Sequence, residues 1–200
     1  MRYYMFNKPR GVITACSDAR HETVMKYFVG EEPGLFPVGR LDKETEGLLL
    51  MTDDGSFCYR INTPMMKKEK TYVFYARGEM TEEKLSALCS GVDIGTGERV
   101  FVSAVSVEHL ESLTLLDVAE LAGENAARIA PTGRATLPVC KVRMTITEGK
   151  KHQVKRMAGA VGLRVLYLER VNVAGVPLDP LLKRGEYRPL SDEEIEILMK

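Results

Sequence analysis

The clearest pattern along the chain is a short apolar run at residues 48–51, which polar turn residues bound on both sides. A run of this length between turn signals is typical of a buried strand. The segment Gly39-Arg40-Leu41-Asp42 comes shortly before the run, so we expect it to form a loop that a core element holds in place. Loops held in this way are where catalytic groups concentrate.

The rest of the chain alternates between strand and helix signals. Segments rich in β-branched and aromatic residues predict strands, and capped amphipathic segments that end at Gly or Pro predict helices. The predicted strands cover residues 3–6, 12–14, 71–76, 141–147 and 164–171, with a hairpin within 92–107. The predicted helices cover residues 55–62, 81–90, 152–160 and 193–200, and a short one follows a turn within 18–30. Residues 108–134 show no readable period, and we expect a mobile or helical insertion there.

Composition changes this picture only through the distribution of charge. The 200 residues are 44% hydrophobic and 28% charged, which describes an ordinary globular protein with a core. The net charge is zero, and this argues weakly against a nucleic-acid partner. However, residues 141–170 hold eight bases against two acids, and residues 101–130 hold five acids against one base. The basic segment is either a solvated face or a surface that contacts phosphates.

Several classes of protein are excluded by what the sequence lacks. The three histidines complete no metal-ligand spacing, and no Cys-x-x-Cys pair exists, so no metal site is predicted. Neither a signal peptide nor an apolar run long enough to cross a bilayer is visible. We therefore expect a cytoplasmic protein with no membrane partner, whose thiols stay free in a reducing compartment. The four cysteines are Cys16, Cys58, Cys89 and Cys140.

Asp42 is the first candidate for chemistry. Arg40 lies two residues before it, and a cation nearby keeps a carboxylate ionised. An ionised carboxylate can act as a nucleophile or a base. The alternative is that Asp42 is a turn residue that accepts hydrogen bonds from its own backbone, and spacing alone favours this second interpretation.

Three motifs together resemble the pseudouridine synthases. Gly-Arg-Leu-Asp at 39–42, with Thr-Glu-Gly-Leu at 45–48, resembles the signature of that family, and more narrowly of its RsuA-type branch, which acts on ribosomal RNA. Lys-Thr-Tyr at 70–72 and the segment at 148–157, which contains His-Gln-Val-Lys-Arg, resemble the second and third motifs and follow in the family's order. The resemblance covers about 2–80 and 140–190 of this sequence.

The resemblance implies a role for individual residues. Asp42 would be the catalytic residue, Tyr72 would position the uracil, and Lys155 would pair with the Asp42 carboxylate. Arg is more common than Lys at the last position, and Lys cannot make the same bidentate fork. Without the resemblance, Tyr72 would be interpreted as a surface residue on an edge strand. The residues that the resemblance implies for substrate binding are Arg40, Leu41, Lys8, Pro9, Lys151, His152, Gln153, Arg156 and Leu168.

The fold and function that the resemblance implies are equally specific. We expect an α+β catalytic domain with a mixed, mostly antiparallel sheet, flanking helices and a central active-site cleft. Residues 1–200 would form this single domain, which can consist of two subdomains, with a variable insertion at 108–138 and no N-terminal S4-type RNA-binding domain. It would isomerise a specific uridine of ribosomal RNA to pseudouridine as a monomer and without a cofactor.

Two other functions are kept beside this one. The chain could be a catalytically silent RNA-binding or ribosome-assembly factor on the same scaffold, although the presence of Asp42, Tyr72 and Lys155 disfavours that. A carboxylate-dependent hydrolase that acts on a sugar ranks last. Such enzymes normally need two flanking carboxylates, and a turn would aim Glu44 and Glu46 away from Asp42.

Overall fold

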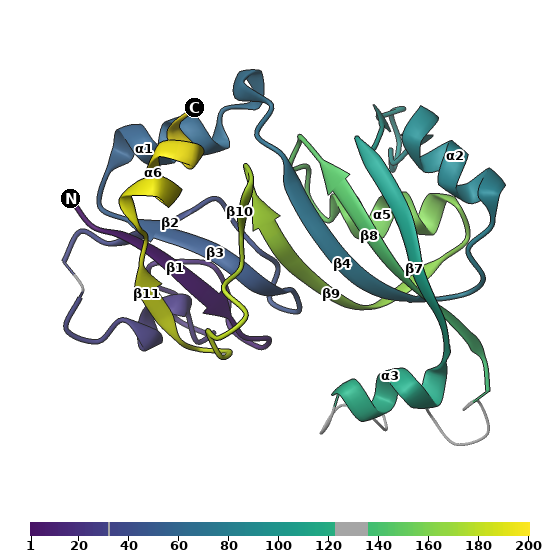
Figure 1. Cartoon of the computed structure of the whole chain (residues 1–200), viewed down its shortest axis with the longest axis horizontal. Coiled ribbons are helices and arrows are strands. Elements are labelled where there is room, and N and C mark those ends of the chain that lie inside the picture. Colours follow the sequence, from purple (N-terminus) through teal and green to yellow (C-terminus); the bar gives the residue numbers. More distant parts are fainter. Residues whose placement is uncertain (32, 123–135) are drawn as a thin grey trace. The chain divides into compact units, whose positions relative to one another are not determined.

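The chain folds into two compact units, each built around strands of a sheet (Figure 1). A computed structural model describes all residues except 32 and 123–135. Unit 1 comprises Met1–Thr71 and Glu169–Lys200, and unit 2 comprises Tyr72–Leu168. Strand β9 (Arg164–Val173) contributes residues to both units.

Unit 1 contains a mixed sheet in which the predicted buried strand is central. The strands follow the order β11 (Tyr187–Pro189), β1 (Tyr3–Lys8), β3 (Glu46–Thr52) and β9, with β2 (Phe36–Val38) paired to β3 and β10 (Val176–Pro177) paired to β9. The pairing of β3 with β9 is parallel, and the other pairings are antiparallel. All seven residues of β3 are buried, which confirms the prediction from the apolar run.

Gly47 allows β3 and β9 to approach each other closely. It lies opposite Arg170 in the parallel pair, and its φ of +96° is in the region that favours glycine. A Cβ added at Gly47 would collide with the backbone carbonyl oxygen of Arg170. A side chain at this position therefore cannot be accommodated without moving one of the two strands.

Two capped helices cover part of the unit 1 core. Helix α1 (Gly55–Asn62) starts at Asp54, whose Oδ1 accepts from the backbone nitrogens of Ser56 and Phe57 at 2.8 and 3.2 Å. Helix α6 (Asp192–Met199) starts with a capping box formed by Ser191 and Glu194. The apolar faces of both helices pack onto one cluster, which includes Met5, Leu48, Leu50, Phe57 and Leu198. Two short 3-10 helices, Val24–Tyr27 and Pro64–Met66, complete the unit.

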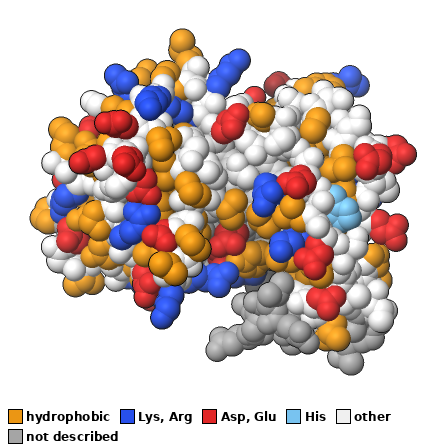
Figure 2. Space-filling model, viewed as in Figure 1, with side chains coloured by type: hydrophobic (Ala, Val, Ile, Leu, Met, Phe, Trp, Pro, Cys, Tyr) orange, Lys and Arg blue, Asp and Glu red, His pale blue; other side chains and the backbone are white. Residues whose placement is uncertain are grey.

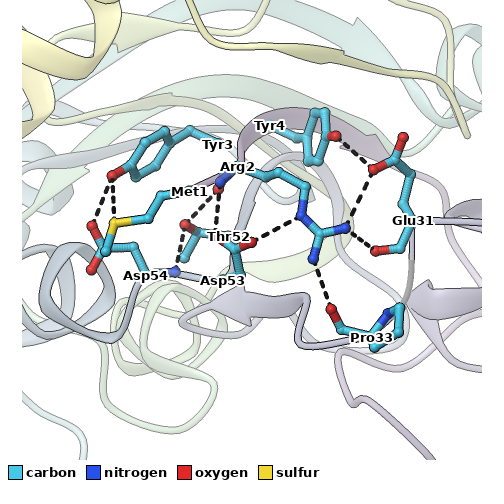
Figure 3. Close-up of polar contacts among 9 residues, drawn as sticks. All are labelled: Met1, Arg2, Tyr3, Tyr4, Glu31, Pro33, Thr52, Asp53 and Asp54. Atoms are coloured by element: carbon cyan, nitrogen blue, oxygen red, sulfur yellow. Dashed lines mark hydrogen bonds and ion pairs between the residues drawn. The ribbon is translucent and has the colours of Figure 1, made fainter.

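A polar network around Arg2 fixes the start of β1 (Figure 3). The Arg2 backbone nitrogen and Nε donate to the two carboxylate oxygens of Asp53, at 2.7 and 2.9 Å. The guanidinium also reaches the carbonyl oxygens of Glu31 and Pro33, and the Tyr4 hydroxyl donates to the Glu31 carboxylate at 2.7 Å. One arginine thus connects β1, the end of β3 and the loop before β2.

Unit 2 contains the long strands β4 (Lys70–Arg77), β8 (Pro138–Ile146) and β7 (Ser106–Thr114), in this order, with the first two residues of β4 in unit 1. A small antiparallel pair, β5 (Val92–Asp93) and β6 (Phe101–Val102), forms the predicted hairpin. The helices are α2 (Glu82–Ser90), α3 (Leu115–Ala122) and α5 (Gln153–Ala160). These elements and those of unit 1 confirm the predicted α+β class with a mostly antiparallel sheet.

Strand β7 was not predicted, because most of its side chains are exposed and show little apolar alternation. It pairs antiparallel with β8 from Ser106 opposite Thr145 to Thr114 opposite Pro138, so residues 108–114 of the predicted insertion form a strand. Helix α3 (Leu115–Ala122) follows in the same segment, in line with the expected helical character. The part of the predicted insertion at 123–135 lies outside the described residues. The predicted strand at 12–14 is also wrong, since only one bridge forms there, between Ile13 and Thr23. No helix of the described residues has the length and apolar character needed to span a membrane.

Candidate active site

Asp42 lies on a tight turn between β2 and β3. Its backbone carbonyl accepts from the Thr45 nitrogen at 3.0 Å, which closes the turn, and the residue is half-buried. Gly39 begins the loop with a φ of +74°, and a Cβ there would lie 2.7 Å from Asn62 Oδ1. The turn interpretation of Asp42 is therefore correct for its backbone, and its carboxylate is presented from a constrained loop.

The buried Lys8 side chain supports this loop through its backbone carbonyls. The side chain is completely buried, and its Nζ lies 2.9 Å from the carbonyl oxygen of Thr45, 3.2 Å from that of Asp42 and 3.0 Å from that of Pro9. The ammonium thus binds carbonyls at both ends of the turn. We expected Lys8 to contact substrate, but the structure places its charge against the backbone of the loop. This contact joins residues far apart in sequence, so nothing in the local pattern could reveal it.

Further contacts tie the loop to residues 10–14. The Thr14 hydroxyl donates to the Leu41 carbonyl at 2.7 Å and accepts from the Leu41 nitrogen at 3.1 Å. The Gly11 nitrogen donates to the Lys43 carbonyl at 2.8 Å, and Arg10 forms an ion pair with Glu44. These contacts, together with those of Lys8, hold the backbone of the loop on both sides of Asp42.

Arg40 and Leu41 have opposite environments within the loop. Leu41 is buried and belongs to the core, so its side chain supports the loop from within. Arg40 is exposed and forms no ion pair with any described residue, Asp42 included. The sequence-based idea that Arg40 keeps the Asp42 carboxylate ionised is therefore not supported. Its guanidinium is available to a ligand, in line with the predicted substrate contact.

Tyr72 and Leu168 are buried strand residues of the predicted site in unit 2. Tyr72 lies on β4 and is 8% exposed, and Leu168 lies on β9 and is 5% exposed. Tyr72 is therefore not the surface residue of the alternative interpretation. A largely buried aromatic ring is suited to hold a flat ligand.

The third motif forms the start of α5. His152 adopts a left-handed backbone conformation, with φ of +54°, directly before the helix. Gln153 is buried, its Oε1 accepts from the Lys150 nitrogen at 2.9 Å, and its Nε2 donates to Glu148 at 3.4 Å. Gln153 therefore shapes the turn before α5. We had expected this side chain to contact substrate. Lys151 and His152 are exposed, whereas Lys155 and Arg156 are half-buried.

The basic segment at 141–170 is partly neutralised by the acidic segment at 101–130. Arg143 forms an ion pair with Glu108 at 2.7 Å, and Lys141 forms one with Glu111 at 3.7 Å, across the β7–β8 pair. Figure 2 likewise shows acidic and basic side chains interspersed over the visible face. The surplus of positive charge in this segment is therefore smaller than the sequence suggests, and it includes Lys150, Lys151 and Arg156 around the start of α5. Among the described residues, no three His, Cys, Asp or Glu side chains are grouped as a metal ion requires.

Comparisons with known proteins agree with the resemblance in the motifs. The family model for RNA pseudouridylate synthase matches residues 2–160. The chain is 41% identical over 196 residues to the ribosomal small subunit pseudouridine synthase A of Escherichia coli, covering 97% of this chain and 72% of that protein. It is 37% identical over 198 residues to YtzG of Bacillus subtilis, an uncharacterised RNA pseudouridine synthase, covering 98% of this chain and 72% of that protein.

Solved structures show the same relationship in the fold. A crystal structure of a pseudouridylate synthase superposes with a TM-score of 0.77 at 33% identity, covering 98% of this chain and 73% of the other. The human RNA pseudouridylate synthase domain containing 1 has the same fold, with a TM-score of 0.60 at 18% identity, covering 99% of this chain and 91% of the other. From the motifs, the matched family model and these relatives together, we conclude that the chain belongs to the RNA pseudouridylate synthase family.

Proposed function

We propose that this protein isomerises a specific uridine of ribosomal RNA to pseudouridine, with Asp42 as the catalytic carboxylate. The ribosomal substrate is proposed from the relative at 41% identity, whose name gives the small ribosomal subunit as its target. The observation that carries the role of Asp42 is the construction of its loop. Lys8 and Thr14 hold the backbone on both sides of Asp42, so the carboxylate is positioned before any substrate arrives.

The reaction rearranges bonds without a change of oxidation state. The bond from N1 of uracil to C1′ of the ribose breaks, a bond from C5 to C1′ forms, C5 loses a proton and N1 gains one. No electrons are gained or lost overall, so the chemistry requires a nucleophile or base and a means of holding the detached ring. A carboxylate can provide the first of these functions.

The other predicted residues have separate proposed roles. Stacking on the Tyr72 ring would hold the uracil, since stacking stabilises an unstacked base by roughly 1–3 kcal/mol. Lys155 would favour the ionised form of the catalytic carboxylate. Arg40 would contact the RNA, because the target base must leave its stack before the sugar and base edges become accessible. Lys8 and Gln153 are positioning residues in this proposal, and neither touches substrate.

We also propose that the two units act together as one catalytic domain, and that the protein works as a monomer in the cytoplasm. All three motifs lie in one chain, which supports a monomer that acts as one domain. The cysteines are scattered, which supports a reducing compartment. The remaining basic residues around the start of α5, Lys150, Lys151 and Arg156, would contact phosphates. Such contacts make affinity depend on salt in the same way for all RNA sequences.

The test is to incubate the purified protein with ribosomal RNA that carries no modification and to map pseudouridine at single-nucleotide resolution. The proposal expects conversion at one or a few uridines. Binding of the RNA with no conversion at any uridine would favour the silent RNA-binding factor instead. Release of free uracil or cleavage at a sugar would favour the hydrolase.

A further inference from the structure

Three basic residues of unit 1 lie on neighbouring segments, since Lys70 begins β4, Lys68 comes just before it and Arg170 is on the adjacent strand β9. None of them is one of the site residues described above. Lys68 and Arg170 are 9% and 4% exposed, and Lys70 is half-buried. The Lys70 Nζ donates to the Lys68 carbonyl at 2.8 Å, and the Arg170 Nε donates to the Leu48 carbonyl at 2.7 Å. The segment that carries both lysines is attached to the turn after β9, since the Ala174 nitrogen donates to the Glu69 carbonyl at 2.7 Å. We call Lys68, Lys70 and Arg170 the buried basic cluster.

Among the residues that the structure describes, no carboxylate is paired with the buried basic cluster. Within the described part of the chain, none of its three members forms an ion pair. Glu69 lies between the two lysines in sequence, but it is exposed and pairs with neither. Burial, followed by the charges of Arg170 and Lys68, lowers the pKa of Lys70 to about 8. Buried like charges without a counter-ion destabilise a fold, and an anion bound to the cluster would relieve their repulsion.

The Lys68 ammonium remains accessible to such an anion. Among the described residues, the fully buried side-chain polar atoms that lack a hydrogen-bond partner are Asn7 Oδ1 and Thr45 Oγ1. The Lys68 Nζ also has no partner in the described part of the chain, yet it is not one of these fully buried atoms. The stem of Lys68 is therefore buried while its charged end reaches the surface, as is usual for lysine.

The buried basic cluster is connected along two strands to the residues proposed to hold the uracil. Lys70 precedes Tyr72 by two positions on β4, and Arg170 follows Leu168 by two positions on β9. Side chains two residues apart on a strand point to the same face and are separated by about 7 Å. Each uracil-contacting residue thus has a cluster member beside it on its own strand, at a separation comparable to one nucleotide step.

We propose that Lys68, Lys70 and Arg170 bind a backbone phosphate of the RNA next to the target uridine. This inference rests on the proposed function, because it takes Tyr72 and Leu168 as the residues that contact the uracil. A phosphodiester supplies the negative charge that the cluster lacks, and its oxygens accept charge-assisted hydrogen bonds from the ammonium and guanidinium groups. The subsite would fix the register of the strand on the enzyme and carry no sequence information.

The first experiment follows the Lys70 side chain by NMR of lysine labelled at Cε, with the signal assigned from the Lys70→Gln variant. The probes are a single-stranded RNA decamer that contains one uridine, free uridine and inorganic phosphate. The decamer is expected to raise the pKa of Lys70 above its value of about 8, because an anion favours the charged form. Free uridine, which has no phosphate, is expected to leave it unchanged.

The second experiment compares two neighbouring lysines. Lys68→Gln and Lys67→Gln make the same change of charge, but Lys67 is exposed. We expect Lys68→Gln to weaken binding of the decamer about tenfold and Lys67→Gln to weaken it less than about twofold. The slope of log affinity against log salt should fall by about 0.7 for the loss of one phosphate contact in Lys68→Gln. Thermal unfolding of both variants checks that each is folded.

Both experiments are repeated in the Asp42→Asn background, which separates this inference from the proposed chemistry. If the Lys70 pKa rises with RNA in that background while the wild-type protein forms no pseudouridine in ribosomal RNA, the subsite stands and the proposed function fails. If the decamer binds without moving the Lys70 pKa, or if the two glutamine variants bind equally well, the subsite is wrong. An equal rise with inorganic phosphate at the same concentration would also contradict it, since the cluster would then be a site for free anions.

Discussion

The Nζ of Lys8 lies 3.2 Å from the backbone carbonyl oxygen of Asp42, so a fully buried cation supports the residue proposed to perform the chemistry. The same ammonium binds the Thr45 carbonyl at 2.9 Å, and Thr45 is where the turn closes. The position of the Asp42 backbone is therefore set by β1, on which Lys8 lies. Strand β1 and the Asp42 loop therefore form one structural element.

The first prediction concerns Lys8. Lys8→Met keeps the apolar stem but leaves buried carbonyls without their donor, so the free energy of unfolding should fall by about 3 kcal/mol. The rate of isomerisation should fall more than about tenfold, while the affinity for RNA changes little, because the group positions the carboxylate and does not touch substrate. Denaturant unfolding and separate measurements of kcat and KM check this.

Lys43→Met is the matched control for that variant. Lys43 lies in the same loop and is exposed, so its loss should leave both the free energy of unfolding and kcat nearly unchanged. Equal effects of the two substitutions would show that Lys8 does not support the loop in particular.

The second prediction concerns the close approach of β3 and β9. Gly47→Ala places a Cβ against the Arg170 carbonyl and forces a left-handed φ on alanine, so it should destabilise the protein by more than about 3 kcal/mol. Gly55→Ala is the control, because a Cβ at the first position of α1 meets nothing within 4 Å. That change should be neutral or slightly stabilising. Similar melting temperatures for the two variants would contradict the parallel pairing of β3 with β9.

The third prediction concerns acid sensitivity at the C-terminal end. Arg188 forms two hydrogen bonds of 2.8 Å with the Glu194 carboxylate, and its Nε contacts Asp179 at 2.7 Å. The Arg188 guanidinium holds the pKa of Glu194 below its usual 4.5. A depressed pKa in the folded state means that the unfolded state binds more protons as the pH falls, so this contribution is present above pH 4.5 and is lost below it.

Glu194→Gln should accordingly lower the free energy of unfolding at pH 7, and its difference from the wild type should shrink as the pH falls below 4.5. Denaturant titrations at pH 7, 5 and 3.5 measure this. A difference that stays constant over this range would indicate that the capping box with Ser191, and not the charge of Glu194, is responsible.

The elements of the fold that local signals specify were predicted well from the sequence. Helix α1 has the predicted bounds because Asp54 caps its first turn and Thr63-Pro64 cannot continue it. Strand β3 was predicted from its continuous apolar run, and the structure shows that all of its residues are buried. The family motifs placed Asp42 on a constrained loop, and the structure adds the contacts that constrain it.

The predictions that failed depend on contacts between distant parts of the chain. Exposed strand β7 has no apolar period, and it is stabilised by its pairing with β8, whose register no local pattern reveals. The same register brings Glu108 to Arg143, so the basic surplus was overestimated. Lys8 and Gln153 were expected to contact substrate because they lie in family motifs, but their burial and backbone partners make them structural supports.

The most direct test of the account is the Asp42→Asn variant. The substitution keeps the size of the side chain and removes its charge, while the contacts that Lys8 and Thr14 make with the backbone carbonyls of Asp42 and Leu41 should persist. The account predicts a folded protein with unchanged unfolding free energy and RNA affinity that forms no detectable pseudouridine in ribosomal RNA under conditions in which the wild type reaches completion. Substantial pseudouridine formation by the folded asparagine variant would contradict the assignment of Asp42 as the catalytic carboxylate.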